Sequence, residues 1–204
     1  MPKGAGMASR ASWRQGSLDR QHLAARPPRT TVGVSLSEVR FTGKINLRAK
    51  PDVAMIEAVH GALGCALPVE PGATGGSDSC TILWIGPTEW LVVVPPGAEA
   101  ATLSSLEGAL SGQHAAVNDV GEGLHVIRLS GPDSRLVLAK GCPLDLHPRV
   151  FGPGRCARSI VAKATVLVHQ LDDSPSFDLY VDRTVAEYLW RWLEDAASTL
   201  AGIK

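Results

Sequence analysis

Three residues in the second half of the chain have the side chains that metal sites and thiol enzymes use. Cys142, His147 and Cys156 follow the spacing C-x4-H-x8-C. A structural zinc site normally has four ligands in close pairs, and the sequence shows no fourth ligand here. A cysteine nucleophile paired with histidine needs a third group that orients the ring, and none is evident. We therefore expect packed cysteines and a hydrogen-bonded histidine at these positions. A thiol or metal enzyme ranks third among the functions considered for the chain.

The run from Gly152 to Ala157 matches G-x-G-x-x-A, a pattern found in dinucleotide-binding loops. Such a loop needs a strand before it and a helix after it, so that the phosphate meets the helix N-terminal amides. Pro148 and Pro153 interrupt the approach, and residues 159–168 have strand character. We therefore expect no nucleotide site at this loop.

The last predicted helix has an aromatic residue outside its apolar stripe. The stripe consists of Val185, Tyr188, Leu189, Trp192, Ala196 and Leu200. Trp190 lies about 140° from Val185 around the helix axis, so it is either covered by a loop of its own chain or exposed for a partner. Trp and Arg are enriched at the energetic centres of interfaces, and Arg191 is its neighbour. The candidate interface residues are Trp190 and Arg191, with Arg149 and Phe151 of the Pro/Gly-rich loop 148–154.

The elements that position these residues occur twice along the chain. The first set is an extended segment (33–48), a helix opened by Pro51-Asp52 and ended by Gly64, a loop (68–79), two hairpin strands (81–85 and 89–94) and a helix from about residue 98. The second set is a strand (125–129), a helix between Asp133 and Gly141, two strands (159–170 and 177–181) and a helix opened by the capping box Thr184-Val-Ala-Glu187.

The two sets match with a small drift in spacing. Pro51-Asp52 corresponds to Pro132-Asp133, and Trp90, Val92 and Val94 correspond to Phe177, Leu179 and Val181. This order predicts an α+β fold made of a duplicated β-α-β-β-α unit with a pseudo-two-fold axis. We expect one domain over residues 31–204, with halves of about 31–115 and 116–204.

Composition places the chain among ordinary globular proteins. Of its 204 residues, 45% are hydrophobic and 20% charged, and the 20 Lys and Arg residues balance the 20 Asp and Glu residues. This balance argues against a nucleic-acid binder, and no apolar stretch approaches the roughly 18 residues of a membrane span. Four cysteines without a secretory signal are expected to be thiols, which favours a cytoplasmic protein.

Residues 1–30 form a basic tail with six basic side chains and one acidic one. The tail has no helical or strand period and lacks the apolar segment of a secretory signal. Its Arg- and Ser-rich composition is also typical of an organellar transit peptide, so that alternative stays open. We expect a disordered extension.

Four separated segments of the chain form a recognisable set. They are Phe41-Thr-Gly-Lys-Ile-Asn-Leu-Arg48, Trp84-Ile-Gly-Pro-Thr-Glu-Trp-Leu91, the run from Lys140 to Ala157, and Tyr188-Leu-Trp-Arg-Trp-Leu-Glu-Asp195. In this order they resemble the gamma subunit of heterotetrameric sarcosine oxidase. The resemblance extends from about Val32 to Ala197. It implies a fold like the folate-binding domain of the glycine-cleavage T-protein. It also implies a complex that oxidatively demethylates sarcosine to glycine, hydrogen peroxide and, with tetrahydrofolate, methylenetetrahydrofolate.

In this family the cofactors FAD, FMN, NAD, folate and zinc belong to the alpha, beta and delta subunits, and the gamma subunit is regarded as non-catalytic. T-protein relatives carry an acidic catalytic residue on a strand of the second half. The matching stretch here, Ala164 to His169, contains no carboxylate. The resemblance therefore implies a structural subunit with no catalytic, cofactor-binding or metal residues. The alternative is a stand-alone folate-binding or aminomethyltransferase-like protein, which would need an acidic residue near His169 and an open central pocket.

Overall fold

The computed structural model describes residues 18–19, 29–31 and 33–200. Across these residues the chain forms two antiparallel sheets, with the strand orders β4-β5-β6-β3-β7 and β1-β2-β8-β11-β10-β9. The strands are β1 (Arg29–Thr31), β2 (Val34–Val39), β3 (Gly43–Ala49), β4 (Thr74–Ser77), β5 (Cys80–Gly86), β6 (Glu89–Val94), β7 (Ala115–Asp119), β8 (Leu124–Ser130), β9 (Arg155–Val161), β10 (Ala164–Asp172) and β11 (Ser176–Asp182). The helices are α1 (Val53–Leu63), α2 (Glu99–Ala109), α3 (Ser134–Ala139) and α4 (Ala186–Ser198). The predicted α+β class is confirmed.

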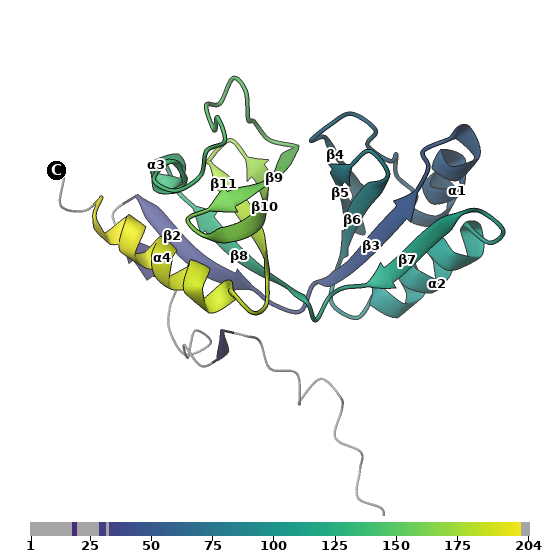
Figure 1. Ribbon diagram of the computed structural model, residues 1–204, viewed down its shortest axis with the longest axis horizontal. Coiled ribbons are helices and arrows are strands. Elements are labelled where there is room, and N and C mark those ends of the chain that lie inside the picture. The colour runs from purple at the N-terminus through teal and green to yellow at the C-terminus, as the bar shows by residue number, and fades with distance from the viewer. Residues whose placement is uncertain (1–17, 20–28, 32, 201–204) are drawn as a thin grey trace, which may run out of the picture.

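The helices lie on the outer flanks of the molecule and the sheets lie between them (Figure 1). Side chains of α1 and α2 form one buried cluster with the first sheet, and those of α3 and α4 form another with the second sheet. A third cluster joins the inner faces, where Leu83 and Leu91 of the first sheet pack with Val126, Leu167 and Tyr180 of the second. Successive residues of a strand point to opposite faces, so each strand divides its side chains between a helix-facing side and this inner side.

The predicted duplication is confirmed, with one exchange of strands. The series β3-α1-β4-β5-β6-α2 corresponds to β8-α3-β9-β10-β11-α4, and the paired strands occupy equivalent places in the two sheets. Strand β7 lies beside β3, and β2 takes the same place beside β8. The strand that precedes the first repeat therefore completes the sheet of the second repeat.

Each repeat contains a strand that the sequence does not predict. The segment 159–170 is two strands, β9 and β10, because the chain turns at Ala162, a non-glycine residue with φ of 54°. Alanine rarely adopts positive φ, so the usual Gly or Asn turn signal is missing. The equivalent strand β4 lies inside the predicted loop 68–79 and pairs with β5.

The sequence predicts the start of helix α1 correctly and the cap of helix α4 incorrectly. The Asp52 side chain caps α1 by accepting a hydrogen bond of 2.9 Å from the Met55 amide, and Gly64 ends the helix in the left-handed conformation. The capping box predicted for α4 is wrong. The helix begins at Ala186, and the Thr184 hydroxyl donates a hydrogen bond to the Asp182 carboxylate instead.

The apolar stripe predicted for α4 is rotated from the buried face. The buried residues are Ala186, Leu189, Trp190, Leu193, Ala196 and Ala197. Tyr188, expected in the stripe, is 40% exposed. No helix of the described ranges is both long enough and apolar enough to cross a membrane.

The predicted disordered tail falls mostly on residues outside those described. Four described residues of this segment take part in the fold: Leu18, Asp19, Arg29 and Thr30. Leu18 is fully buried in the cluster beneath the second sheet, and Asp19 forms an ion pair with Arg40 at the end of β2. Strand β1 pairs with β2 and extends the same sheet.

Candidate functional site

A cleft lies between the two sheets and is lined by residues of both halves. Strands β8, β10 and β11 supply Arg128, His169, Asp178 and Tyr180 from the second sheet. The opposite side consists of Thr42, the hairpin segment 77–81 and residues 93–95. The cleft brings buried and exposed polar side chains of both halves together, so it is the candidate site.

Asp178 and Arg128 form a two-point ion pair across β11 and β8. Arg128 Nε donates to Asp178 Oδ1 at 2.7 Å, and Arg128 Nη2 donates to Oδ2 at 2.9 Å. The carboxylate is 7% exposed, whereas the guanidinium side chain is 40% exposed towards the cleft. The hydrogen bond to Asp178 raises the pKa of Arg128 above its ordinary value. A buried carboxylate needs such a partner, because an unpaired charge is costly to remove from water.

His169 lies directly across from Asp178 in the pairing of β10 with β11. The residue is 6% exposed, and its Nδ1 atom has no hydrogen-bond partner within the described part of the chain. Burial lowers the pKa of His169 to about 4, so the ring is neutral at neutral pH. Burial likewise raises the pKa of Tyr180, which keeps that hydroxyl protonated. The floor of the cleft therefore offers one neutral imidazole, one phenol and one neutralised ion pair.

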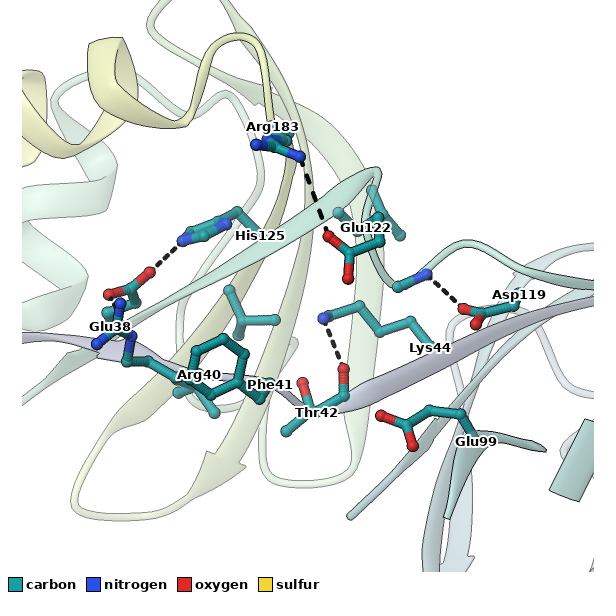
Figure 2. Close-up of a pocket in the computed structure, with 14 residues that line it drawn as sticks. Glu38, Arg40, Phe41, Thr42, Lys44, Glu99, Asp119, Glu122, His125 and Arg183 are labelled. Carbon is teal, nitrogen blue, oxygen red and sulfur yellow. Dashed lines mark hydrogen bonds and ion pairs between the residues drawn. The ribbon is translucent and has the colours of Figure 1, made fainter. Parts of the chain in front are cut away.

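A second pocket lies where the β2–β3 and β7–β8 connections run side by side (Figure 2). Glu38 lines this pocket with a side chain only 4% exposed, and it forms a hydrogen bond with His125 and an ion pair with Arg40. Arg183 approaches Glu122 at 4.0 Å, and Asp119 accepts from the Gly121 amide at 2.8 Å (Figure 2). Several charged side chains at this junction therefore have partners within the chain, which suits a seam that joins the repeats.

The comparisons with known proteins agree on one family. A model of the sarcosine oxidase gamma subunit family matches residues 48–199. The gamma subunit of sarcosine oxidase from Corynebacterium sp. (strain P-1) is 36% identical over 184 residues, which are 89% of this chain and 89% of that protein. The chain belongs to the sarcosine oxidase gamma subunit family. The Arthrobacter sp gamma subunit is also 36% identical, over 96% of this chain and 98% of that one.

Two solved structures have folds similar to that of this chain. A chain of the heterotetrameric sarcosine oxidase from Corynebacterium sp. U-96, in complex with pyrrole 2-carboxylate, matches with a TM-score of 0.85 and 31% identity. This match covers 94% of the present chain and 98% of that chain. The glycine cleavage system aminomethyltransferase T from Bartonella henselae matches with a TM-score of 0.60 at 15% identity, over 87% of this chain and 48% of that one. The second likeness shows the fold alone, and it confirms the predicted T-protein-like architecture.

The structure separates the three residues considered for metal or thiol chemistry in this gamma family chain. Cys142 contacts the Ser159 hydroxyl at 3.9 Å, Cys156 donates to the Trp84 carbonyl at 3.2 Å, and His147 Nδ1 accepts from a backbone amide at 3.2 Å. No group of three or more potential metal ligands occurs among the described residues. The G-x-G-x-x-A run leads into strand β9, which agrees with the expectation of no nucleotide loop.

The four candidate interface residues divide into two buried and two exposed side chains. Trp190 is 2% exposed and packs in the core with the second sheet, so its own chain covers it, which is the first of the two alternatives. Phe151 is 6% exposed in the same core. The contact role expected for these two side chains conflicts with their burial in the single chain. Arg149 and Arg191 are exposed, and Arg191 also forms a 2.6 Å ion pair with Glu187.

Sequence reasoning missed the polar residues of the central cleft. Within β11 the alternation of Phe177, Leu179 and Val181 places Asp178 and Tyr180 on the opposite, inner face. A charged residue on that face of a single strand is normally solvated, so the pattern alone does not mark it as a site residue. The pairing of Asp178 with His169 depends on the register between β10 and β11, which the sequence does not specify.

Proposed function

We propose that this chain is a structural subunit of a heterotetrameric sarcosine oxidase and does not itself catalyse the reaction. Its partners would be the alpha, beta and delta subunits, which would hold the FAD, FMN, NAD, tetrahydrofolate and zinc. A cytoplasmic location remains a prediction. The observation that carries the proposal is the match to nearly the whole of one chain of a solved heterotetrameric sarcosine oxidase, at a TM-score of 0.85.

The chemistry of the described side chains supports a role other than catalysis. Burial raises the pKa of Cys156 to about 11, so its thiol is protonated and weakly nucleophilic at neutral pH. Asp178, the buried carboxylate of the cleft, is already neutralised by Arg128. These groups stabilise a fold more readily than they transfer protons or electrons.

The surface around Arg149 is the better supported candidate for a subunit interface. Val150 is 56% exposed beside it, and an apolar groove that includes Trp84, Ile85 and Phe151 runs from this loop across both sheets. Exposed apolar side chains next to arginine are typical of interface centres. On α4, by contrast, the exposed Arg191 is already paired within its own helix.

The test is co-expression of this chain, carrying an affinity tag, with candidate alpha, beta and delta subunits. Stoichiometric recovery of the large chains with a visible flavin spectrum, absent from this chain alone, is the expected result. Val150→Glu should reduce recovery at least tenfold, whereas Lys50→Glu, an exposed change on the first repeat, should not. A tagged chain that elutes alone and colourless under conditions where the other three subunits assemble would contradict the proposal.

A second function is favoured by one specific observation. A stand-alone folate-binding protein would need a carboxylate near His169 and an open central pocket, and Asp178 lies across from His169 in the cleft. Titration of the isolated chain with tetrahydrofolate, followed by tryptophan fluorescence, measures this directly. Saturable micromolar binding that Asp178→Asn abolishes would support the second function. Asp173→Asn, an exposed change in the β10–β11 turn, is the matched control.

A further inference from the structure

Two cysteines of the first repeat lie in direct contact. Cys65 follows the end of α1, and Cys80 is the first residue of β5. The two cysteines therefore lie at opposite ends of the segment that connects α1 to β5. Their sulfur atoms are 3.3 Å apart, and each residue is 6% exposed. The other two cysteines contact oxygen atoms instead, at Ser159 and Trp84. The first repeat therefore contains a preformed dithiol.

We propose that Cys65 and Cys80 are a modification site, oxidised by a hydroperoxide to an intramolecular disulfide that fixes the hairpin at the mouth of the central cleft. A disulfide bond is about 2.05 Å long, so the sulfurs have to approach by only about 1.3 Å. Rotation about the two Cα–Cβ bonds is the movement that brings them together. The proposal does not depend on the proposed subunit role.

Access favours Cys80 as the sulfur that meets the oxidant. Cys80 lines the cleft, next to the exposed Ser77 and Ser79, whereas Cys65 is not among the residues that line it. Burial, together with its neighbour Cys80, raises the pKa of Cys65 to about 11. Cys65 therefore remains a thiol at neutral pH and acts second, as the resolving cysteine.

The reaction balances with one equivalent of hydroperoxide. The Cys80 thiolate attacks one peroxide oxygen, the O–O bond breaks, and Cys80 becomes a sulfenic acid while hydroxide leaves. The Cys65 thiol then loses its proton as its sulfur attacks the Cys80 sulfur, the S–S bond forms, and the S–O bond breaks with loss of a second hydroxide. The two protons released by the thiols convert both hydroxides to water. The sulfurs together lose two electrons, which reduce the peroxide.

The disulfide would close a loop that holds the contact between the repeats. Fourteen residues separate the cysteines, and they include β4, the edge strand of the first sheet. Immediately before β4, Ala73 pairs with Arg155 of β9 in the second sheet. Fixing both ends of this segment restricts the side of the cleft that Ser77 and Ser79 line. It also restricts the strand edge through which the two sheets meet.

The experiment uses the full chain, reduced, desalted and then treated with millimolar hydrogen peroxide at mildly alkaline pH. The free thiol count should fall from four to two. Endoproteinase Asp-N cleaves before Asp78 and so separates Cys65 and Cys80, which should then appear as two linked peptides, two hydrogens lighter than their sum. The melting temperature should rise by roughly 5–10 °C and return to its starting value with reductant.

Matched variants test whether Cys65 and Cys80 are the two cysteines that form the disulfide. Cys65→Ser should prevent both the linked peptides and the rise in melting temperature, whereas Cys142→Ser should retain both. Four free thiols after treatment would overturn the proposal, and so would linkage to Cys142 or Cys156. Oxygen added to Cys80 without linkage would also overturn it, because it would show that Cys65 cannot resolve the sulfenic acid.

Discussion

Replacing His169 with glutamine should remove much of the sensitivity of the fold to mild acid. His169 is 6% exposed in the cleft, and its pKa falls from 6.5 to about 4 because burial disfavours the charged ring. Asp178 partly opposes this shift and Arg128 adds to it. Between these two pH values the unfolded chain binds a proton at this residue that the folded chain does not bind. Stability is therefore lost as the pH falls from about 6.5 towards 4.

The magnitude follows from the difference between the two pKa values. One pKa unit corresponds to about 1.4 kcal/mol, so the complete loss below pH 4 approaches roughly 3 kcal/mol. Between pH 7 and pH 5 the free energy of unfolding should fall by about 2 kcal/mol because of His169 alone. Glutamine has no titrating group in this range, so His169→Gln should lack this part of the pH dependence whatever its absolute stability.

Urea unfolding of the full chain, followed by tryptophan fluorescence from pH 7 to pH 5, measures this loss. His114→Gln is the matched control, because it removes an exposed histidine and should retain the wild-type pH dependence. If wild type and His169→Gln change in parallel, His169 is not a buried neutral ring, and the account of the cleft given above is incorrect.

Five further substitutions test packing, backbone conformation and the ion pair. Trp190→Ala should lower the free energy of unfolding by about 3–5 kcal/mol and Arg191→Ala by less than about 0.5 kcal/mol, because only the tryptophan is buried. Gly131→Ala should destabilise by about 1–3 kcal/mol, because its φ is 110° and a Cβ would lie 2.5 Å from a backbone oxygen. Gly61→Ala, in α1 with no neighbour within 4 Å, should instead stabilise by about 0.5–1 kcal/mol. Asp178→Asn should cost about 1–3 kcal/mol in urea unfolding, because it removes the charge that neutralises a partly buried arginine.

The parts of the fold predicted from sequence are those with strong local patterns. Helix α1 has a capping aspartate and a terminal glycine, and the β5–β6 hairpin has two apolar strands about Gly86. Strands β4 and β7 escaped prediction because their sequences, Thr-Gly-Gly-Ser and Ala-Ala-Val-Asn-Asp, have little strand propensity. They exist because β5 and β3 offer them hydrogen-bonding edges. Such pairing is a tertiary property that a local pattern does not contain.

The candidate site was less predictable than the fold. Resemblance drew attention to His169, yet the carboxylate sought near it along β10 lies on the neighbouring strand as Asp178. Trp190 lay outside the predicted apolar stripe, which left open whether its own chain or a partner covers it. The buried face of α4 runs through Leu189, Trp190 and Leu193 instead, so the stripe was centred on the wrong face of the helix.

The duplication itself argues that the polar residues of the cleft serve a function. The correspondence of Trp90 with Phe177 equates Asp178 with Leu91, and the strand registers then equate His169 with Leu83. In the first repeat these positions form an apolar pair within the inter-sheet core. The second repeat buries a carboxylate and an unpartnered imidazole there, and an unpaired buried polar group costs about 1–3 kcal/mol. Since the first repeat shows that a leucine satisfies the fold at this place, the second repeat retains the unpartnered imidazole of His169 at the expense of stability. Folding alone does not explain that choice, whereas contact of the cleft with a polar ligand or partner would.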